Sequence, residues 1–219
     1  MDLIKPDKDQ KMKFLFKHAL SRIGLKVVGA FDQIAAGGKK DNNTKVTVKQ
    51  IDIYGAGQIG VSGDLNLNNL SAGLARWTNI TKASGAGALF SISGDALNTT
   101  IKDGGEVAFA TQPEGVTAAE KNVFEDATRY FMVIPTGNTD ITVTITYYVQ
   151  TLDAALSTAV DGSRIENVIS KKITVNLENN KAYNLKLILG LTSVKLDAEV
   201  ADWQVDGSNE VYLPQNTAE

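Results

Sequence analysis

Residues 55–60 have the spacing most suggestive of chemistry, because their sequence GAGQIG matches the pattern G-x-G-x-x-G. In a dinucleotide-binding site, such glycines let the backbone approach a pyrophosphate that is held at the N-terminus of the next helix. The following residues 61–68 read VSGDLNLN and alternate polar with apolar side chains, so no amphipathic helix begins there. No second strand ends in an acid about 20 residues on, where residues 77–81 read WTNIT. The motif indicates a glycine-rich connection between strands, and a nucleotide-binding enzyme is the least favoured function.

Metal-binding side chains are scarce. The sequence has no cysteine and one histidine, His18, which excludes a cysteine-bearing zinc site and a site with several histidines. Residues 64–68 (DLNLN) have the composition of a calcium loop. Their leucines, however, put the polar side chains on one face of a strand, whereas a calcium loop curls its ligands around the ion. We expect no metal and no cofactor.

Catalytic side chains are equally hard to assemble. A nucleophilic triad needs a serine, a histidine and an acid together in space, and the sequence leaves Ser21 with a distant aspartate open. The chain contains no nucleophile elbow of the form G-x-S-x-G. Carboxylate pairs such as those at 103/106 and 125/126 fall in turns or on solvated faces, which supports acid–base chemistry weakly. We expect a protein without enzymatic activity.

Two aromatic residues, Tyr54 and Trp77, could stack on a sugar ring. Neither Trp77 nor Trp203 has aromatic neighbours within its own segment, which favours packing in the core or at a sheet edge. A carbohydrate-binding β-sandwich is therefore the alternative function, with Tyr54 and Trp77 as its candidate contact residues.

The composition is that of an ordinary globular protein. Of 219 residues, 43% are hydrophobic and 21% are charged, and the formal net charge is −3. This charge argues against a nucleic-acid footprint, which needs a strong local excess of Lys and Arg. No run of about 18 apolar residues could cross a membrane, and residues 1–13 lack the apolar core of a signal peptide. Composition leaves open whether the protein is cytoplasmic or is a mature or truncated product.

The elements that must carry any site are strands, because the dominant hydrophobic period is two. Residues 141–150 read ITVTITYYVQ, which alternates β-branched and aromatic side chains between a buried and a wet face. Residues 173–177 and 183–189 alternate in the same way around the polar turn 178–181 and predict a hairpin. Further strands are expected after Gly190, where Trp203 breaks the parity of the last one, and at 44–54, 64–68, 88–93, 106–110 and 130–135.

Helices are expected to be few and short. Residues 117–120 (TAAE) have the form of a capping box, which predicts a helix at 118–127, and 153–160 is a weaker candidate. Residues 14–28 fit a bulged strand or a helical stripe, and Gly24 disfavours the helix, so we assign a strand. Many strands separated by Gly, Asn and Asp turns indicate a β-sandwich.

Three stretches, in order, resemble segments of the Bacteroides-type fimbrillin family. Residues 14–23 (FLFKHALSRI) are similar to its F-x-H-A-L-[SA]-[KR]-[IL] segment. Residues 131–136 (FMVIPT), with the strand after them, are similar to its I-P-T/Q element and next strand. Residues 181–203 resemble its closing strands, which finish on a tryptophan. The order and spacing of the stretches agree with the family from about residue 13 to 205, most of the chain.

The resemblance implies an all-β fold, a transthyretin-like antiparallel β-sandwich with one or two short helices. It also implies an exported lipoprotein that is incorporated into a fimbrium at the outer membrane and cell surface. Its partners would be other fimbrial subunits, and a host or bacterial surface glycan or protein. Such subunits are joined by a donated strand, which adds main-chain hydrogen bonds to an open edge. The family supplies no catalytic residues.

We expect an N-terminal tail at 1–12, one domain at 13–205 and a C-terminal tail at 206–219. Residues Glu210, Val211, Tyr212 and Leu213, before Pro214, form the candidate strand-exchange segment. Full-length relatives carry a signal peptide with a lipidated cysteine and an additional N-terminal domain. We therefore expect the chain to be the C-terminal part of such a protein or an abbreviated relative. A stalk subunit, a tip or anchor subunit and a related surface adhesin stay open, as does the adhesive ligand.

Overall fold

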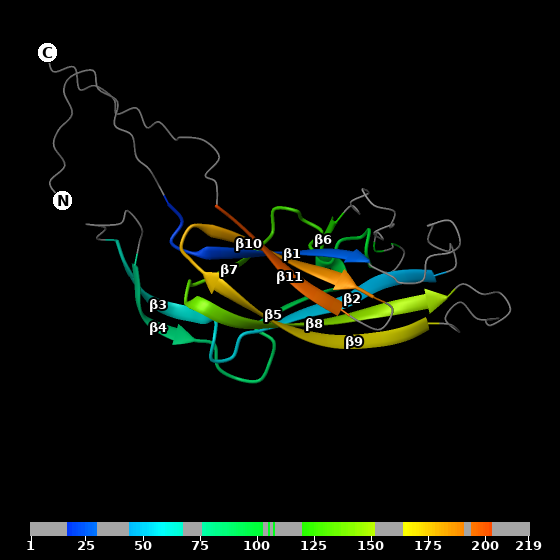
Figure 1. Cartoon of the computed structure of the whole chain (residues 1–219), viewed down its shortest axis with the longest axis horizontal. Coiled ribbons are helices and arrows are strands. Elements are labelled where there is room, and N and C mark those ends of the chain that lie inside the picture. Colours follow the sequence, from blue (N-terminus) through cyan, green and yellow to red (C-terminus); the bar gives the residue numbers. More distant parts are fainter. Residues whose placement is uncertain are drawn as a thin grey trace, which may run out of the picture.

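Two β-sheets face each other across one hydrophobic core (Figure 1). The computed structural model describes residues 17–29, 44–67, 76–102, 105, 107, 120–151, 164–190 and 194–202. The strands are β1 (Ser21–Gly29), β2 (Thr44–Tyr54), β3 (Gly60–Asn66), β4 (Arg76–Lys82), β5 (Phe90–Ser93), β6 (Lys121–Asn122), β7 (Phe131–Val133), β8 (Gly137–Thr151), β9 (Arg164–Leu177), β10 (Lys181–Leu189) and β11 (Val194–Asp202). The expected all-β sandwich is confirmed, while the transthyretin-like detail stays a prediction.

The strand order explains the two layers. One sheet runs β11-β10-β1-β6, with β7 also paired to β1, and the other runs β5-β2-β8-β9. The hairpin β3–β4 forms a separate two-stranded sheet at the left-hand end of Figure 1. Strands β1 and β10 pair in parallel, and the other paired strands among the described residues are antiparallel. The pairing of β1 with β10 brings a strand from the start of the chain beside one from near its end.

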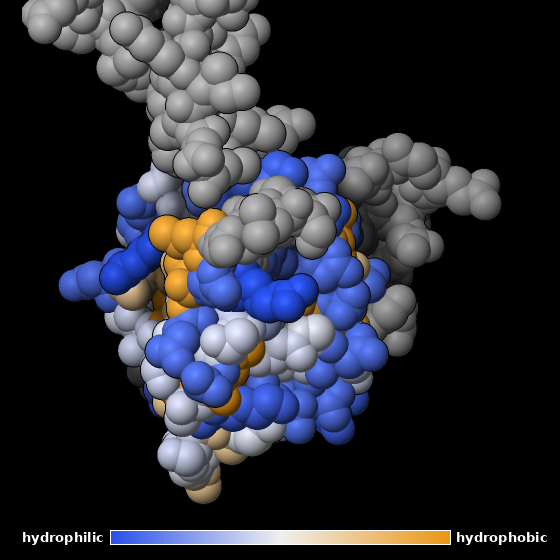
Figure 2. Space-filling view, turned by 90° about the vertical axis from the view of Figure 1, so that its left-hand side faces the viewer, coloured by the Kyte–Doolittle hydropathy of each residue, from blue (hydrophilic) through white to orange (hydrophobic). Residues whose placement is uncertain are grey.

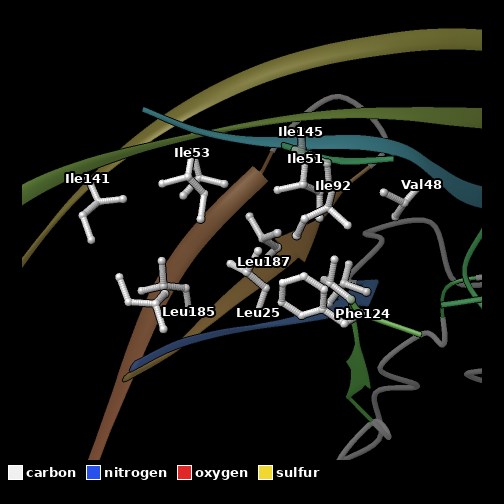
Figure 3. Packing of buried hydrophobic residues seen from close by; sticks show 14 of the residues in the cluster. Leu25, Val48, Ile51, Ile53, Ile92, Phe124, Ile141, Ile145, Leu185 and Leu187 are labelled. Atoms are coloured by element: carbon white, nitrogen blue, oxygen red, sulfur yellow. The ribbon is translucent and has the colours of Figure 1, made fainter. Parts of the chain in front are cut away.

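The core follows from alternation on the facing strands. In β8, Ile141, Val143, Ile145 and Tyr147 are buried, as the period of two predicts, while the intervening threonines lie on the outer face. Figure 3 shows Ile141 and Ile145, with Ile51 and Ile53 of β2, pointing toward Leu25, Leu185 and Leu187 of the opposite sheet. Burial of such aliphatic side chains is the main favourable term for a sandwich without disulfides.

The turn Glu178–Asn180 carries the chain from one sheet to the other. The predicted hairpin across residues 173–189 is wrong, because β9 and β10 belong to different sheets. Asn180 adopts a left-handed conformation with φ of 61°, and its side-chain oxygen accepts a hydrogen bond of 3.1 Å from the backbone N–H of His18. The Tyr183 hydroxyl bridges the corner, accepting from the Glu178 N–H at 2.9 Å. Hydrophobic alternation specifies which face of a strand is buried, not which strand lies beside it.

The predicted helix at 118–127 is also wrong over the residues that the structure describes. Lys121 and Asn122 form the short strand β6 on β1, and the Val123 N–H donates to the carbonyl oxygen of Leu25 at 3.0 Å. Both Val123 and Phe124 are buried. These long-range hydrogen bonds take the place of the hydrogen bonds within a helix. A helix buries residues three or four apart on one face, and burying both Val123 and Phe124, which are adjacent, suits an irregular segment better. The described residues contain one 3₁₀-helix, Gly94–Ala96, and no α-helix; the weaker helix candidate at 153–160 lies outside them.

Residues 55–60 connect β2 to β3, as the sequence predicts for a glycine-rich turn. Gly57 has φ of 70°, a conformation that glycine adopts at little cost. The N–H groups of Gln58 and Ile59 both bind the carbonyl oxygen of Gly55, at 2.9 and 3.0 Å. A strand rather than a helix follows, so the geometry of a dinucleotide-binding turn is not formed.

Candidate interaction surfaces

The residues with reactive side chains serve structure here. The Ser21 hydroxyl is buried and donates a hydrogen bond of 2.8 Å to the backbone carbonyl of Glu178. Partial burial, with the charge of Arg22, lowers the pKa of His18. In the part of the chain that the structure describes, no three His, Asp or Glu side chains gather as metal ligands, and no helix is long and apolar enough to cross a membrane.

Trp77 lies on β4 and forms one wall of a hollow of about 440 Å³. Its indole Nε1 donates a hydrogen bond of 2.7 Å to the carbonyl oxygen of Ala19, so the ring is held in place. The other lining side chains are mostly apolar and come from Leu20, Ile59, Val61, Leu89, Phe90, Met132 and Ile134. The end of the molecule seen in Figure 2 has apolar atoms at the surface among hydrophilic ones. This hollow can accept an apolar group.

Tyr54 does not join Trp77 in that hollow. It ends β2 and pairs with Thr142 of β8, and the residues lining the hollow do not include it. The two aromatic residues selected from the sequence therefore do not form one platform. Residues 210–213 lie outside the described residues.

The outer edge of β11 has no strand partner among the described residues. The strand pairs with β10 on one side only. Its inward-facing positions, paired with buried residues of β10, are Leu196, Ala198 and Val200. Val200 is 57% exposed although it lies on the core side. The core therefore opens at this edge.

A second hollow, of about 400 Å³, lies between β11 and β9, the edge strands of the two sheets. It is lined by Thr174, Val175, Asn176, Glu178, Lys181, Tyr183, Ala198 and Val200. The floor is apolar, because Val175 and Tyr183 are buried, and the rim is polar. Two sheet edges that flank an apolar floor form the geometry to which an extended segment can add.

By contrast, the edge of β1 is covered. Short strands β6 and β7 both pair with it. Glu120, just before β6, forms ion pairs with Lys26 of β1 at 3.3 Å and with Lys186 of β10. Lys26 and Lys186 are cross-strand neighbours in the parallel pair, so the carboxylate offsets their repulsion. The hydrogen bond from Lys186 is the main cause of the lowered pKa of Glu120.

Charges divide unevenly between the edges. Strand β11 carries Asp197, Glu199 and Asp202, of which Asp202 pairs with Lys181 at 2.5 Å. Strand β9 carries three cations, Arg164, Lys171 and Lys172, against one acid, Glu166, which pairs with Lys49 at 2.8 Å. Sequence reasoning found neither edge, because period two does not say which strand is outermost.

The fold is similar to solved structures from the Bacteroides group. A fimbrial protein from Bacteroides vulgatus ATCC 8482 aligns with a TM-score of 0.54 and 18% identity, over 86% of this chain and 55% of that chain. Two structures described as putative cell adhesion proteins align with this chain at lower TM-scores. For the one from Parabacteroides distasonis ATCC 8503, the TM-score is 0.39 and the identity 9%, over 85% of this chain and 52% of that chain. For the one from Bacteroides ovatus ATCC 8483, the TM-score is 0.35 and the identity 15%, over 86% of this chain and 47% of that chain.

The chain spans about half the length of these three structures. No family model and no curated protein matches the sequence. The likeness shows that this chain shares its fold with a fimbrial protein.

Proposed function

We propose that this protein is a fimbrillin-like structural and adhesive subunit of cell-surface fimbriae. It binds other subunits by strand addition and has no enzymatic activity. The fold shared with the Bacteroides vulgatus fimbrial protein supports the class of function. The observation that carries the proposal is the open edge of β11 beside an apolar hollow.

The edge of β11 suits a short donated strand. Main-chain groups along an open edge provide hydrogen bonds, and alternate side chains of the added strand enter the apolar floor. The candidate donor is segment 210–213 of another subunit. In that segment Val211 and Leu213 alternate with Tyr212, and Pro214 would end a donated strand because it lacks an N–H group. Val211 and Leu213 would face Ala198 and Val200.

The test is polymer formation by the full chain, which light scattering and electron microscopy detect. We expect polymers from the wild type, and their loss when residues 205–219 are deleted. Val200→Glu should also block assembly, because it places a charge on the apolar floor. Ala201→Glu is the matched control, since it adds the same charge to the next residue on the exposed outer face.

Two results contradict the proposal. A wild type that never polymerises would remove the fimbrial function. Polymers that survive both the deletion and Val200→Glu would leave fimbrial assembly intact but exclude tail donation to β11. Polymers blocked equally by Val200→Glu and Ala201→Glu would indicate a general effect of charge on β11.

A carbohydrate-binding module is the second candidate, favoured by the hollow beside Trp77. Its lining offers few polar groups, and the Trp77 N–H is already used by Ala19, which suits an apolar ligand better than a sugar. With Trp203→Phe, Trp77 is the sole tryptophan and reports binding by fluorescence. A fluorescence change with glycans that also bind on an array would favour this function.

A further inference from the structure

The stretch 165–173 of β9 is an open sheet edge that exposes large apolar side chains. Among the described residues β9 pairs with β8 alone. Ile165 is 65% exposed and Val168 is 61% exposed, whereas Ile169 and Ile173 are half-buried against the core. Natural proteins usually protect such an edge, because it readily pairs with another strand. An edge with this character calls for a partner.

We propose that this edge pairs with the same edge of a second copy, with the two β9 strands antiparallel about a two-fold axis at Ile169. A two-fold interface must be self-complementary, because each residue i that meets residue j also has j meeting i. In this register Ile169 faces itself and Ile165 faces Ile173 of the second copy. These positions share the inner face of the sheet, as the pairing of Ile169 with Ile145 and of Ile173 with Ile141 shows.

The outer face is complementary in charge at the same register. Glu166 faces Lys172 of the second copy. Within one chain Glu166 already binds Lys49 at 2.8 Å, and Lys172 binds Asp140 at 2.5 Å. The dimer therefore joins these two ion pairs into a row whose charges alternate in sign. The hydrogen bond from Lys49 lowers the pKa of Glu166, so its carboxylate is charged at neutral pH.

Neighbouring registers are less favourable. In an antiparallel ladder, a residue whose backbone N–H and C=O groups point toward the second copy must pair with a residue of the same kind. Such residues alternate along β9. The two-fold axis therefore has to pass through a residue and not between two residues. An axis at 168 sets Arg164 against Lys172, two like charges, and an axis at 170 sets Val168 against Lys172. Axes at 167 or 171 still pair isoleucines but leave Glu166 facing Val168 or Asn176. Cross-strand pairs of opposite charge stabilise a sheet, and like charges destabilise it.

Lys171 lies on the inner face of β9, where an inward-pointing cation commonly guards an edge against pairing. The proposed register sets it against Asn167 of the second copy, an amide rather than a cation or an isoleucine. The two four-stranded sheets then become one continuous sheet. This closed dimer is distinct from the open polymer that strand donation produces, and it does not rest on the proposed function.

The absence of cysteine makes a crosslinking test clean, because an introduced cysteine can only react with the same position of another copy. In full-length protein, Ile169→Cys should form disulfide-linked dimers under mild oxidation, since directly opposed residues lie within disulfide reach. Ile165→Cys alone should not, because its two copies would be about 27 Å apart, eight residues along the strand. A mixture of Ile165→Cys and Ile173→Cys should crosslink as a heterodimer.

A charge exchange tests the register without touching the isoleucines. Glu166→Lys sets lysine against Lys172, and should weaken dimerisation roughly tenfold or more in Kd, measured by analytical ultracentrifugation. The double variant Glu166→Lys/Lys172→Glu restores opposite charges across the axis and should restore the dimer. Effects inside one chain predict no rescue, because the double variant leaves Lys49 beside a lysine and Asp140 beside a glutamate.

The outcomes separate the two inferences. A wild-type chain that remains monomeric up to about 1 mM overturns the β9 dimer, as does crosslinking of Ile165→Cys as fast as Ile169→Cys. Failure of the charge exchange to rescue dimerisation overturns the register. Polymers that form without the β9 crosslink leave the fimbrial function standing and remove only the dimer.

Discussion

The indole N–H of Trp77 donates a hydrogen bond of 2.7 Å to the carbonyl oxygen of Ala19, which lies 58 residues earlier in the chain. This bond joins the β3–β4 hairpin to the segment that enters β1. The hairpin is otherwise a separate two-stranded sheet, bridged through Gly60 to Ile134, the residue after β7. Trp77 therefore helps to position the hairpin and the wall of the hollow beside it.

We expect Trp77→Phe to lower the free energy of unfolding by about 1 kcal/mol. Phenylalanine keeps most of the apolar contact but leaves the Ala19 carbonyl without its donor, and a typical hydrogen bond contributes about that much. Urea unfolding followed by circular dichroism measures the change. An unaltered midpoint and slope would mean that this bond does not hold the hairpin.

Tyr147→Phe should destabilise the protein by about 1–2 kcal/mol, because it leaves a buried carbonyl without a partner. The Tyr147 hydroxyl is fully buried and donates to the carbonyl oxygen of Gly190 at 3.0 Å. Its neighbour provides a matched control. The ring of Tyr148 lies on the wet face beneath the Arg164 guanidinium, 3.5 Å from its centroid, and Tyr148→Phe keeps that ring. Equal losses of unfolding free energy in both variants would contradict this assignment.

Burial raises the pKa of Tyr147 above its usual value. A group whose pKa is higher in the folded state stabilises that state fully below the unfolded pKa, about 10 for tyrosine. That contribution is then lost as the pH rises through the folded pKa. Chemical denaturation between neutral and alkaline pH should show a decline for the wild type that is smaller in Tyr147→Phe. Identical alkaline declines would place the titration elsewhere.

Glu120→Gln should lower the free energy of unfolding by about 1 kcal/mol at neutral pH, since it removes the charge between Lys26 and Lys186. The pKa of Glu120 is lower in the folded state. Its contribution is therefore present above the unfolded pKa, about 4.3, and is lost as the pH falls through the folded pKa. The difference between variant and wild type should shrink over that acidic window. A difference that persists unchanged there would assign the effect to packing.

Gly57→Ala should cost about 1–2 kcal/mol of stability, because an L-residue is strained at φ of 70°. No atom beyond the adjacent residues lies within 4 Å of the added methyl group, so overlap with other parts of the fold adds nothing. Thermal unfolding measures the cost.

Titration calorimetry of the wild type with NAD should give no binding heat, because a strand follows this turn. Saturable heat would restore a nucleotide-binding function.

Much of the candidate surface was beyond sequence reasoning. Trp77 was selected from the sequence and does line a hollow, but Tyr54 lies apart from it. The strand that carries Trp77, β4, was not predicted, because its WTNIT core lacks clear alternation. The open edges of β9 and β11 depend on strand order, which no local pattern encodes. The donor segment 210–213 stays a prediction.

The sequence by itself determined the fold class and the buried faces. Strict alternation over residues 141–150 predicted β8 and its inward side chains, because period two maps directly onto the two faces of a strand. The strand at 44–54 was predicted as well, but its buried side chains change parity at the bulge between Val48 and Gln50. The glycines of 55–60 likewise predicted a strand connection.

Only the tertiary structure decided which strands are neighbours. Residues 118–127 carry a helical start signal, yet Val123 and Phe124 gain more from burial against β1 and the core than a short helix gains alone. The turn at 178–180 has the pattern of a hairpin, but the chain crosses to the opposite sheet there. Neighbour choice is set by long-range contacts between faces that are all similarly apolar, and those contacts leave β9 and β11 at the edges.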